Sequence, residues 1–165
     1  MPAILKTFEN EWGFKMNNND SLLNQIHRHF PAPGRDIRTY SPLTLAYLGD
    51  AVYEIIIRTF IVEGQPGTVH ALHKRSSRLV NAKAQAVLAA SVEHSLNEEE
   101  LAVFKRGRNA KSHSVAKNAD IIDYRNATGL EALIGYLYLR GHMERCLELV
   151  QQGLPSILPG GTKTE

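Results

Sequence analysis

Two acidic residues lie inside stretches of the chain that are otherwise apolar. Asp50 lies in the run 45–54, and Glu131 lies in the run 128–135. Burying an unpaired charge is costly, so each carboxylate must either be paired or face a wet or metal-filled cleft. A hard cation such as Mg²⁺ takes one or two protein carboxylates together with water and substrate phosphate. Two interpretations follow: both carboxylates hold one Mg²⁺ that activates water, or each is neutralised by an arginine or a tyrosine hydroxyl.

Basic residues are concentrated in two groups, although the formal net charge is only +2. A first group comes near the predicted loop 107–118 and comprises Lys105, Arg106, Arg108 and Lys111, together with the neutral hydrogen-bond donor Asn109. A second group lies on the polar side of a predicted helix and comprises Lys74, Arg75 and Arg78. No aromatic residue is interleaved with the first group, which favours contact with a duplex backbone over base stacking. The alternative for both groups is a surface that is merely solvated.

Length and composition predict one soluble globular domain. The chain has 165 residues, of which 43% are hydrophobic and 22% charged. No apolar run approaches the roughly 20 residues that span a bilayer, and the N-terminus shows no signal-peptide pattern. Cys146 is the only cysteine, which excludes an internal disulfide and a cysteine-based zinc site. We therefore expect a cytoplasmic protein without a membrane segment.

Apolar spacing and capping signals predict helices throughout and no strand. Ser41 and Pro42 form a strong helix start, and Asn97 with Glu100 forms a capping box. The second predicted helix is apolar on most sides, as expected of a central helix. The predicted helices span residues 21–30, 41–62, 68–92, 97–107, 120–139 and 143–152.

These elements predict one all-α catalytic domain over residues 20–153. It follows a poorly ordered N-terminal extension, 1–19, and precedes a flexible tail, 154–165. Gly129 and Gly135 lie inside a predicted helix, where each costs roughly 1 kcal/mol relative to alanine. We expect them to allow close contact with neighbouring helices.

The two acidic runs also carry a resemblance to a known family. The sequence Tyr-Leu-Gly-Asp-Ala-Val at 47–52 resembles the signature of the ribonuclease III catalytic domain. The sequence Glu-Ala-Leu-Ile-Gly at 131–135 resembles that family's second motif, and the resemblance extends over roughly residues 40–152. The chain is most similar to the small class that lacks a double-stranded-RNA-binding domain, Mini-ribonuclease III, through the segments 73–78, 105–111 and 124–125.

The resemblance implies a homodimeric ribonuclease III endonuclease domain that cleaves double-stranded RNA with Mg²⁺. Asp50 and Glu131 would hold the cation, and the two basic groups would contact the RNA backbone. The products would carry 5′-phosphate and 3′-hydroxyl ends with short 3′ overhangs. Resemblance to the small class implies maturation of the 23S ribosomal RNA precursor in the cytoplasm, with a ribosomal protein on the precursor as a further candidate partner.

Two positions depart from the wider family's pattern. Ribonuclease III proper has a Glu where this chain has Ala46 and an Asp where it has Thr128. Only Asp50 and Glu131 can therefore be carried over as metal ligands. The missing carboxylates support an alternative, a non-catalytic duplex-RNA or ribosome-binding module with the same fold. A third alternative is a helical scaffold in which both carboxylates are structural.

Overall fold

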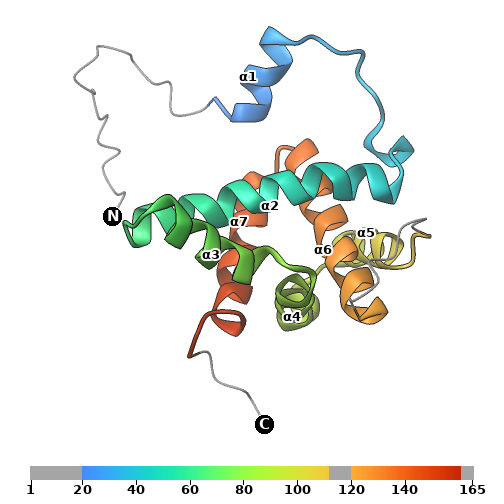
Figure 1. Ribbon diagram of the computed structural model, residues 1–165. Coiled ribbons are helices and arrows are strands. Elements are labelled where there is room, and N and C mark those ends of the chain that lie inside the picture. Colours follow the sequence, from blue (N-terminus) through green and yellow to red (C-terminus); the bar gives the residue numbers. More distant parts are fainter. Residues whose placement is uncertain (1–19, 112–119, 161–165) are drawn as a thin grey trace, which may run out of the picture. The chain divides into compact units, whose positions relative to one another are not determined.

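The computed structural model describes residues 20–111 and 120–160, which contain helices and their connections but no strand (Figure 1). This confirms the all-α prediction. Short 3₁₀ helices cover Ile37–Thr39, Glu93–Ser95 and Leu154–Ser156. The α-helices are α1 (Leu22–His29), α2 (Pro42–Gly64), α3 (Val69–Val80), α4 (Ala82–Val92), α5 (Glu98–Arg108), α6 (Ile121–Leu139) and α7 (Met143–Gly153).

The chain divides into two units between Pro33 and Gly34. In the first unit, the N-terminus of α1 is capped by Ser21, whose Oγ accepts a hydrogen bond from the Asn24 N–H at 3.2 Å. The second unit contains α2 to α7. The predicted catalytic domain began at residue 20, whereas the larger helical unit begins at Gly34.

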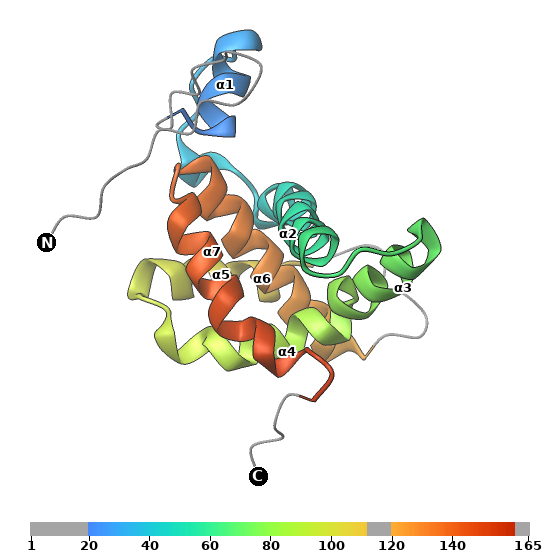
Figure 2. The ribbon, with the colours of Figure 1, turned by 90° about the vertical axis from the view of Figure 1, so that its left-hand side faces the viewer.

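Helix α6 lies at the centre of the second unit and contacts α2, α4, α5 and α7 (Figure 2). Every residue of α6 from Ala127 to Leu137 is buried except Glu131. An enclosed helix needs no polar face, which explains why this stretch is apolar and rich in small residues. Glu131 is thus a charged exception in the middle of the core helix. The core is completed by side chains from α2, α4 and α7, including Tyr53, Ile57, Leu88 and Leu149.

Helix α2 begins and ends close to the predicted residues. Ser41 Oγ accepts a hydrogen bond from the Thr44 N–H at 3.0 Å, and Pro42 is the first helical residue. The apolar pattern of α2 predicted a central helix, surrounded by other helices on most sides. This prediction is wrong, because other helices cover α2 on one side only. It buries Leu45, Val52 and Ile57 but leaves Leu43, Tyr47 and Ile55 exposed.

The prediction of a single helix over residues 68–92 is wrong, because two helices, α3 and α4, meet at Asn81. The Asn81 backbone is extended there, with φ −72° and ψ 159°. Its side-chain oxygen accepts a hydrogen bond from the Ala84 N–H at 3.0 Å and so caps α4. Its side-chain nitrogen donates to the carbonyl oxygens of Ser77 and Arg78, both at 3.0 Å. One asparagine therefore ends one helix and starts the next.

Glycines bring α5 and α6 into close contact. A Cβ atom on Gly107 would lie 2.6 Å from the Ala132 Cβ, and one on Gly129 would lie 2.9 Å from the Phe104 ring. The close approach predicted for Gly129 is therefore confirmed. The predicted loop 107–118 begins too early, because Gly107 and Arg108 belong to α5. Residues 112–118 of that loop lie outside the described residues.

An ion pair fixes α7 against the start of α5. Arg145 Nε donates to Glu100 Oε1 at 2.8 Å, and its Nη2 donates to the Ser95 carbonyl oxygen at 2.8 Å. Glu100 also accepts a hydrogen bond from the Asn97 N–H and completes the predicted capping box, which is confirmed. After α7, the predicted tail begins with a 3₁₀ turn, and Leu154, Ile157 and Leu158 pack against the core.

Candidate active site

Helices α2 and α6 cross in direct backbone contact (Figures 1 and 2). A Cβ atom on Gly49 would lie 1.7 Å from the Glu131 carbonyl oxygen, and one on Gly135 would lie 2.0 Å from the Leu45 carbonyl oxygen. Any side chain at either position would push the two backbones apart. Because Gly49 precedes Asp50 and contacts Glu131 itself, the crossing brings the two predicted carboxylates together on adjacent helices. The close approach predicted for Gly135 is confirmed by the same contact.

The two carboxyl groups disfavour each other's charge. Burial raises the pKa of Glu131 to about 7, and the nearby Asp50 charge adds to the rise. Partial desolvation also raises the pKa of Asp50, with a further contribution from Glu54. The sequence predicted that Asp50 lies inside a buried run. Asp50 is instead exposed, because it lies at the edge of the covered side of α2. A cation would stabilise the charged form of both groups.

Neither carboxylate has a basic partner among the residues that the structure describes. The acidic neighbour Glu54 does have one, since the Arg58 Nε donates to its Oε2 at 2.7 Å. This pairing offsets part of the Glu54 charge, whereas no arginine, lysine or tyrosine hydroxyl bonds to Asp50 or Glu131 within the described ranges. The arrangement favours the metal interpretation over the structural one.

A buried amide borders the same site. Gln85 of α4 is 2% exposed, and its amide interacts with the Glu131 carboxyl group, which partly offsets the rise in that group's pKa because an N–H donor favours the charged form. Its Oε1 has no hydrogen-bond partner among the described residues. A buried oxygen without a donor is unusual in a folded protein, and it leaves this amide able to accept one further hydrogen bond.

These features fit one Mg²⁺ ion with a small set of protein ligands. Two carboxylates supply hard oxygen ligands, and an orphaned amide oxygen could accept a hydrogen bond from water at the site. Within residues 20–111 and 120–160, no group of three or more His, Cys, Asp or Glu side chains converges. The positions where the wider family has further carboxylates hold Ala46 and Thr128, which are both buried.

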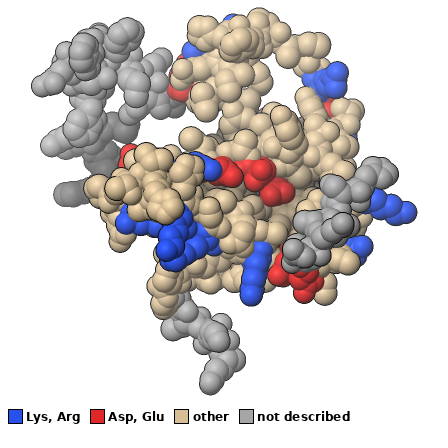
Figure 3. Space-filling model, viewed as in Figure 1, with Lys and Arg blue, Asp and Glu red and all other residues tan. Residues whose placement is uncertain are grey.

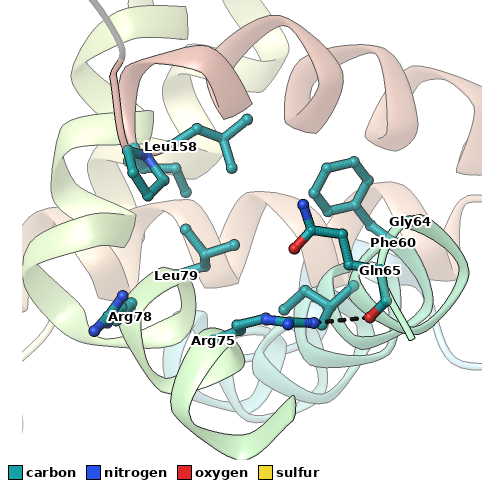
Figure 4. Close-up of a pocket in the computed structure, with 10 residues that line it drawn as sticks. Phe60, Gly64, Gln65, Arg75, Arg78, Leu79 and Leu158 are labelled. Atoms are coloured by element: carbon teal, nitrogen blue, oxygen red, sulfur yellow. Dashed lines mark hydrogen bonds between the residues drawn. The ribbon is translucent and has the colours of Figure 1, made fainter. Parts of the chain in front are cut away.

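The second basic group lies on α3. Lys74 and Arg78 are exposed, while Arg75 is half-buried and its Nη1 donates to the Gln65 carbonyl oxygen at 2.7 Å. Figure 4 shows Arg75 and Arg78 beside a cavity of about 660 Å³, whose other walls include Phe60 and Leu158. In the space-filling view, blue side chains gather over α3 and red ones over the middle of α2 (Figure 3).

The first basic group lies at the end of α5 rather than wholly in a loop. Lys105, Asn109 and Lys111 are exposed. Arg106 is exposed and donates from Nη2 to the Tyr40 carbonyl oxygen at 3.4 Å, while Arg108 stacks over the Phe104 ring at 5.9 Å. The five residues therefore share the α5 terminus, but they differ in how freely each side chain can reach a partner.

Sequence reasoning missed two polar side chains near the site. Gln85 lies in an apolar, alanine-rich run, which is the same signal that singled out Asp50 and Glu131. Tyr53 is fully buried, and its hydroxyl donates to the Leu79 carbonyl oxygen at 2.9 Å. Gln85 could have been found as a polar residue in an apolar helix. The Tyr53 contact depends on the helix break at Asn81 and carries no sequence signal.

None of the helices in the described parts of the chain has both the length and the apolar character needed to cross a membrane.

Comparisons with known proteins give a consistent result. The model of the Ribonuclease III domain family matches residues 43–142. A curated Mini-ribonuclease 3 from Clostridium tetani is 52% identical over 118 residues, which cover 71% of this chain and 78% of that protein. The Mini-ribonuclease 3 of Brevibacillus brevis is 55% identical over 118 residues, covering 72% and 88%. The crystal structure of protein FN1578 from Fusobacterium nucleatum is similar with a TM-score of 0.66 and 33% identity, covering 72% of this chain and 96% of that one.

Proposed function

Because the chain belongs to the ribonuclease III family and is an endoribonuclease for double-stranded RNA, we propose that Asp50 and Glu131 form its Mg²⁺-dependent active site. The observation that carries this proposal is the glycine crossing of α2 and α6, which holds two carboxylates together without a basic partner among the described residues. The proposed cellular substrate is the stem of the 23S ribosomal RNA precursor in the cytoplasm. A ribosomal protein bound to the precursor is a further proposed partner.

The two carboxylates have different environments and hence different roles. Asp50 of α2 is exposed, so RNA can reach it, whereas Glu131 of α6 is half-buried. Glu131 therefore provides a fixed anchor, and Asp50 provides a ligand at the solvent edge. When bound, Mg²⁺ activates water and neutralises charge that develops on the phosphate. The proposed products carry 5′-phosphate and 3′-hydroxyl ends.

We propose that the two basic groups hold the RNA backbone. On α3, Lys74 and Arg78 are the freer side chains, because Arg75 is engaged with Gln65. In the first group, Lys105 of α5 and Lys111 beyond its end are the freer ones, because the Arg108 guanidinium lies over a ring. Such contacts position the duplex without reading its sequence. The remaining proposed contacts come from Arg106 and Asn109.

The active form is proposed to be a homodimer. Leu43, Tyr47, Ala51 and Ile55 follow one another at four-residue spacing along α2, and all four are exposed. Residues spaced by four share one face of a helix, so they form an apolar stripe beside Asp50. Tyr47 is 84% exposed and Ile55 is 58% exposed. A contiguous apolar patch of this kind is typical of a protein–protein interface.

The proposal is tested with end-labelled duplex RNA on a denaturing gel, in Mg²⁺ and in EDTA. We expect cleavage of both strands in Mg²⁺, with cuts offset by a short 3′ overhang. The Asp50→Asn variant should keep its fold and still bind RNA, but it should cleave on the order of 1,000-fold more slowly, because metal-ion catalysis contributes several kcal/mol to the barrier.

The matched control is Glu63→Gln, which removes an exposed carboxylate from the same helix. It should cleave at the wild-type rate. Normal cleavage by Asp50→Asn would refute the assignment of the site. Wild-type protein that shifts a fully paired precursor stem but leaves it uncut would favour the non-catalytic binding module, which the alanine and threonine at positions 46 and 128 also support.

A further inference from the structure

The C-terminus of α3 is closed by side chains from α2, from α4 and from Asn81, which lies between α3 and α4. Because the chain turns at Asn81, the last four carbonyl oxygens of α3 have no N–H partner within the helix. The Asn81 side chain donates to the first two of them, the carbonyl oxygens of Ser77 and Arg78. Tyr53 of α2 donates to the Leu79 carbonyl oxygen at 2.9 Å, and Gln85 Nε2 of α4 donates to the Val80 carbonyl oxygen at 3.1 Å. All four terminal carbonyl groups of α3 are therefore satisfied.

The two long-range bonds differ in what else their donors touch. Tyr53 is fully buried among core residues, and its hydroxyl makes only the bond to Leu79 among the described residues. Gln85 is also buried, but its amide interacts with the Glu131 carboxyl group as well. One amide group therefore donates to the end of α3 and also lies near enough to a carboxyl group of the proposed active site to influence its charge.

The bond to Val80 fixes which way the Gln85 side-chain amide is oriented. Exchanging the amide oxygen and nitrogen would set two oxygens, those of Gln85 and Val80, against each other and lose the bond at 3.1 Å. The nitrogen therefore faces Val80, and the orphaned oxygen remains. A buried acceptor without a donor costs about 1–3 kcal/mol. An apolar side chain of the same size would avoid this cost but would leave the Val80 carbonyl oxygen without its donor, so the amide serves the end of α3 as well as the Glu131 carboxyl group.

From this geometry we infer that Gln85 is a positioning residue that holds the Glu131 carboxylate and links it to α3. The inference rests on the proposed function, in which Glu131 is a metal ligand and α3 carries RNA-binding side chains. Gln85 restricts the Glu131 carboxyl group from the α4 side, while its bond to Val80 sets the distance between that carboxyl group and the end of α3. Partners that orient a metal ligand typically affect metal affinity or activity by 10- to 100-fold.

The test compares two variants that each release one α3 carbonyl group. Gln85→Met removes the amide at similar volume, and Tyr53→Phe removes only the hydroxyl that serves Leu79. For each we would measure kcat and KM on duplex RNA and the affinity for Mn²⁺, a spectroscopic probe of a Mg²⁺ site, without RNA. For Gln85→Met we expect kcat and Mn²⁺ affinity each to fall about 10- to 100-fold with KM within about threefold. For Tyr53→Phe we expect both to stay within about twofold, although the protein should be less stable.

Two results would overturn the inference. Wild-type kcat and Mn²⁺ affinity in Gln85→Met would show that the amide does not orient Glu131. Equal losses in both variants would show that only the closed end of α3 matters. If Gln85→Met does not fold, Gln85→Asn, whose shorter amide cannot span Val80 and Glu131, should show the same losses. If the wild-type protein binds Mn²⁺ but cuts no RNA, the proposed function fails, and the Mn²⁺ affinities of the variants still decide the inference.

Discussion

The carboxylate pair should destabilise the protein when no cation is bound. The pKa of Glu131 is raised from 4.5 to about 7 by burial and then by the Asp50 charge. An acid whose pKa rises on folding binds its proton more tightly in the folded state. The protonated Glu131 carboxyl group therefore contributes fully to the free energy of unfolding below pH 4.5. That free energy falls as the pH rises through about 7. Replacing Glu131 by Gln removes the charge at nearly constant shape and should remove this loss.

The size of the effect follows from the two pKa values. A shift from 4.5 to about 7 costs the folded state about 3 kcal/mol at pH 8 but only about 1 kcal/mol at pH 5. These are upper limits, because Glu131 is half-buried and water screens part of its charge. For a domain of this size, about 1 kcal/mol changes Tm by roughly 2–4 °C. Glu131→Gln should therefore raise Tm by up to roughly 6–12 °C at pH 8 and by much less at pH 5.

Thermal unfolding in EDTA at both pH values measures this directly. Glu63→Gln is the control, and its exposed position should keep its free energy of unfolding within about 0.5 kcal/mol of the wild type. Saturating Mg²⁺ should stabilise the wild type more than Glu131→Gln, because the variant has lost a proposed ligand. The difference in Tm between the two proteins should therefore become smaller or change sign. A variant that is no more stable than the wild type at pH 8 in EDTA would refute the reasoning about the pair.

Two further predictions concern the partners of this surface. Tyr47→Glu places a charge on the apolar stripe of α2 and should convert a dimer to a monomer by light scattering. The control Tyr124→Phe changes a tyrosine of α6 without adding a charge and should leave the mass unchanged, whereas a wild-type mass of one chain would refute the dimer. Replacing Lys105 and Lys111 by Ala should weaken RNA binding. The slope of the logarithm of the binding constant against the logarithm of the salt concentration should become shallower by about 1–2, because fewer counterions are released. An unchanged slope would place the RNA contact elsewhere.

Local signals predicted the helices well where a cap and an apolar face agree. Ser41 with Pro42 and Asn97 with Glu100 marked true helix starts, because each cap satisfies backbone groups within a few residues. The break at Asn81 was missed because its side chain satisfies the ends of both helices, so no Gly or Pro is needed there. The exposed face of α2 was also missed, since its apolar residues look the same whether they meet the core or another surface.

The site was predictable as a set of unusual residues but not as an arrangement. Asp50 and Glu131 stand out because each carries a charge in an apolar run, and Gly135 stands out because glycine weakens a helix. Their meeting depends on the crossing of α2 and α6, which is a contact between backbones far apart in the sequence. The contribution of Gln85 depends in turn on the end of α3. Neither long-range contact has a pattern within one segment.

The two departures from the family pattern make the carboxylate site smaller, which affects how a cation is held. Ala46 and Thr128 are 5% and 7% exposed, and the Thr128 hydroxyl donates to the Tyr124 carbonyl oxygen at 3.0 Å. A carboxylate at either position would be buried and would add a third like charge to a pair whose pKa values are already raised. Two carboxylates match the charge of one divalent cation and leave its other positions to water and substrate phosphate. Under the proposed assignment, cation and RNA should bind cooperatively, because substrate phosphate would complete the coordination. Such a site would be complete only with the duplex in place, which would restrict hydrolysis to bound RNA.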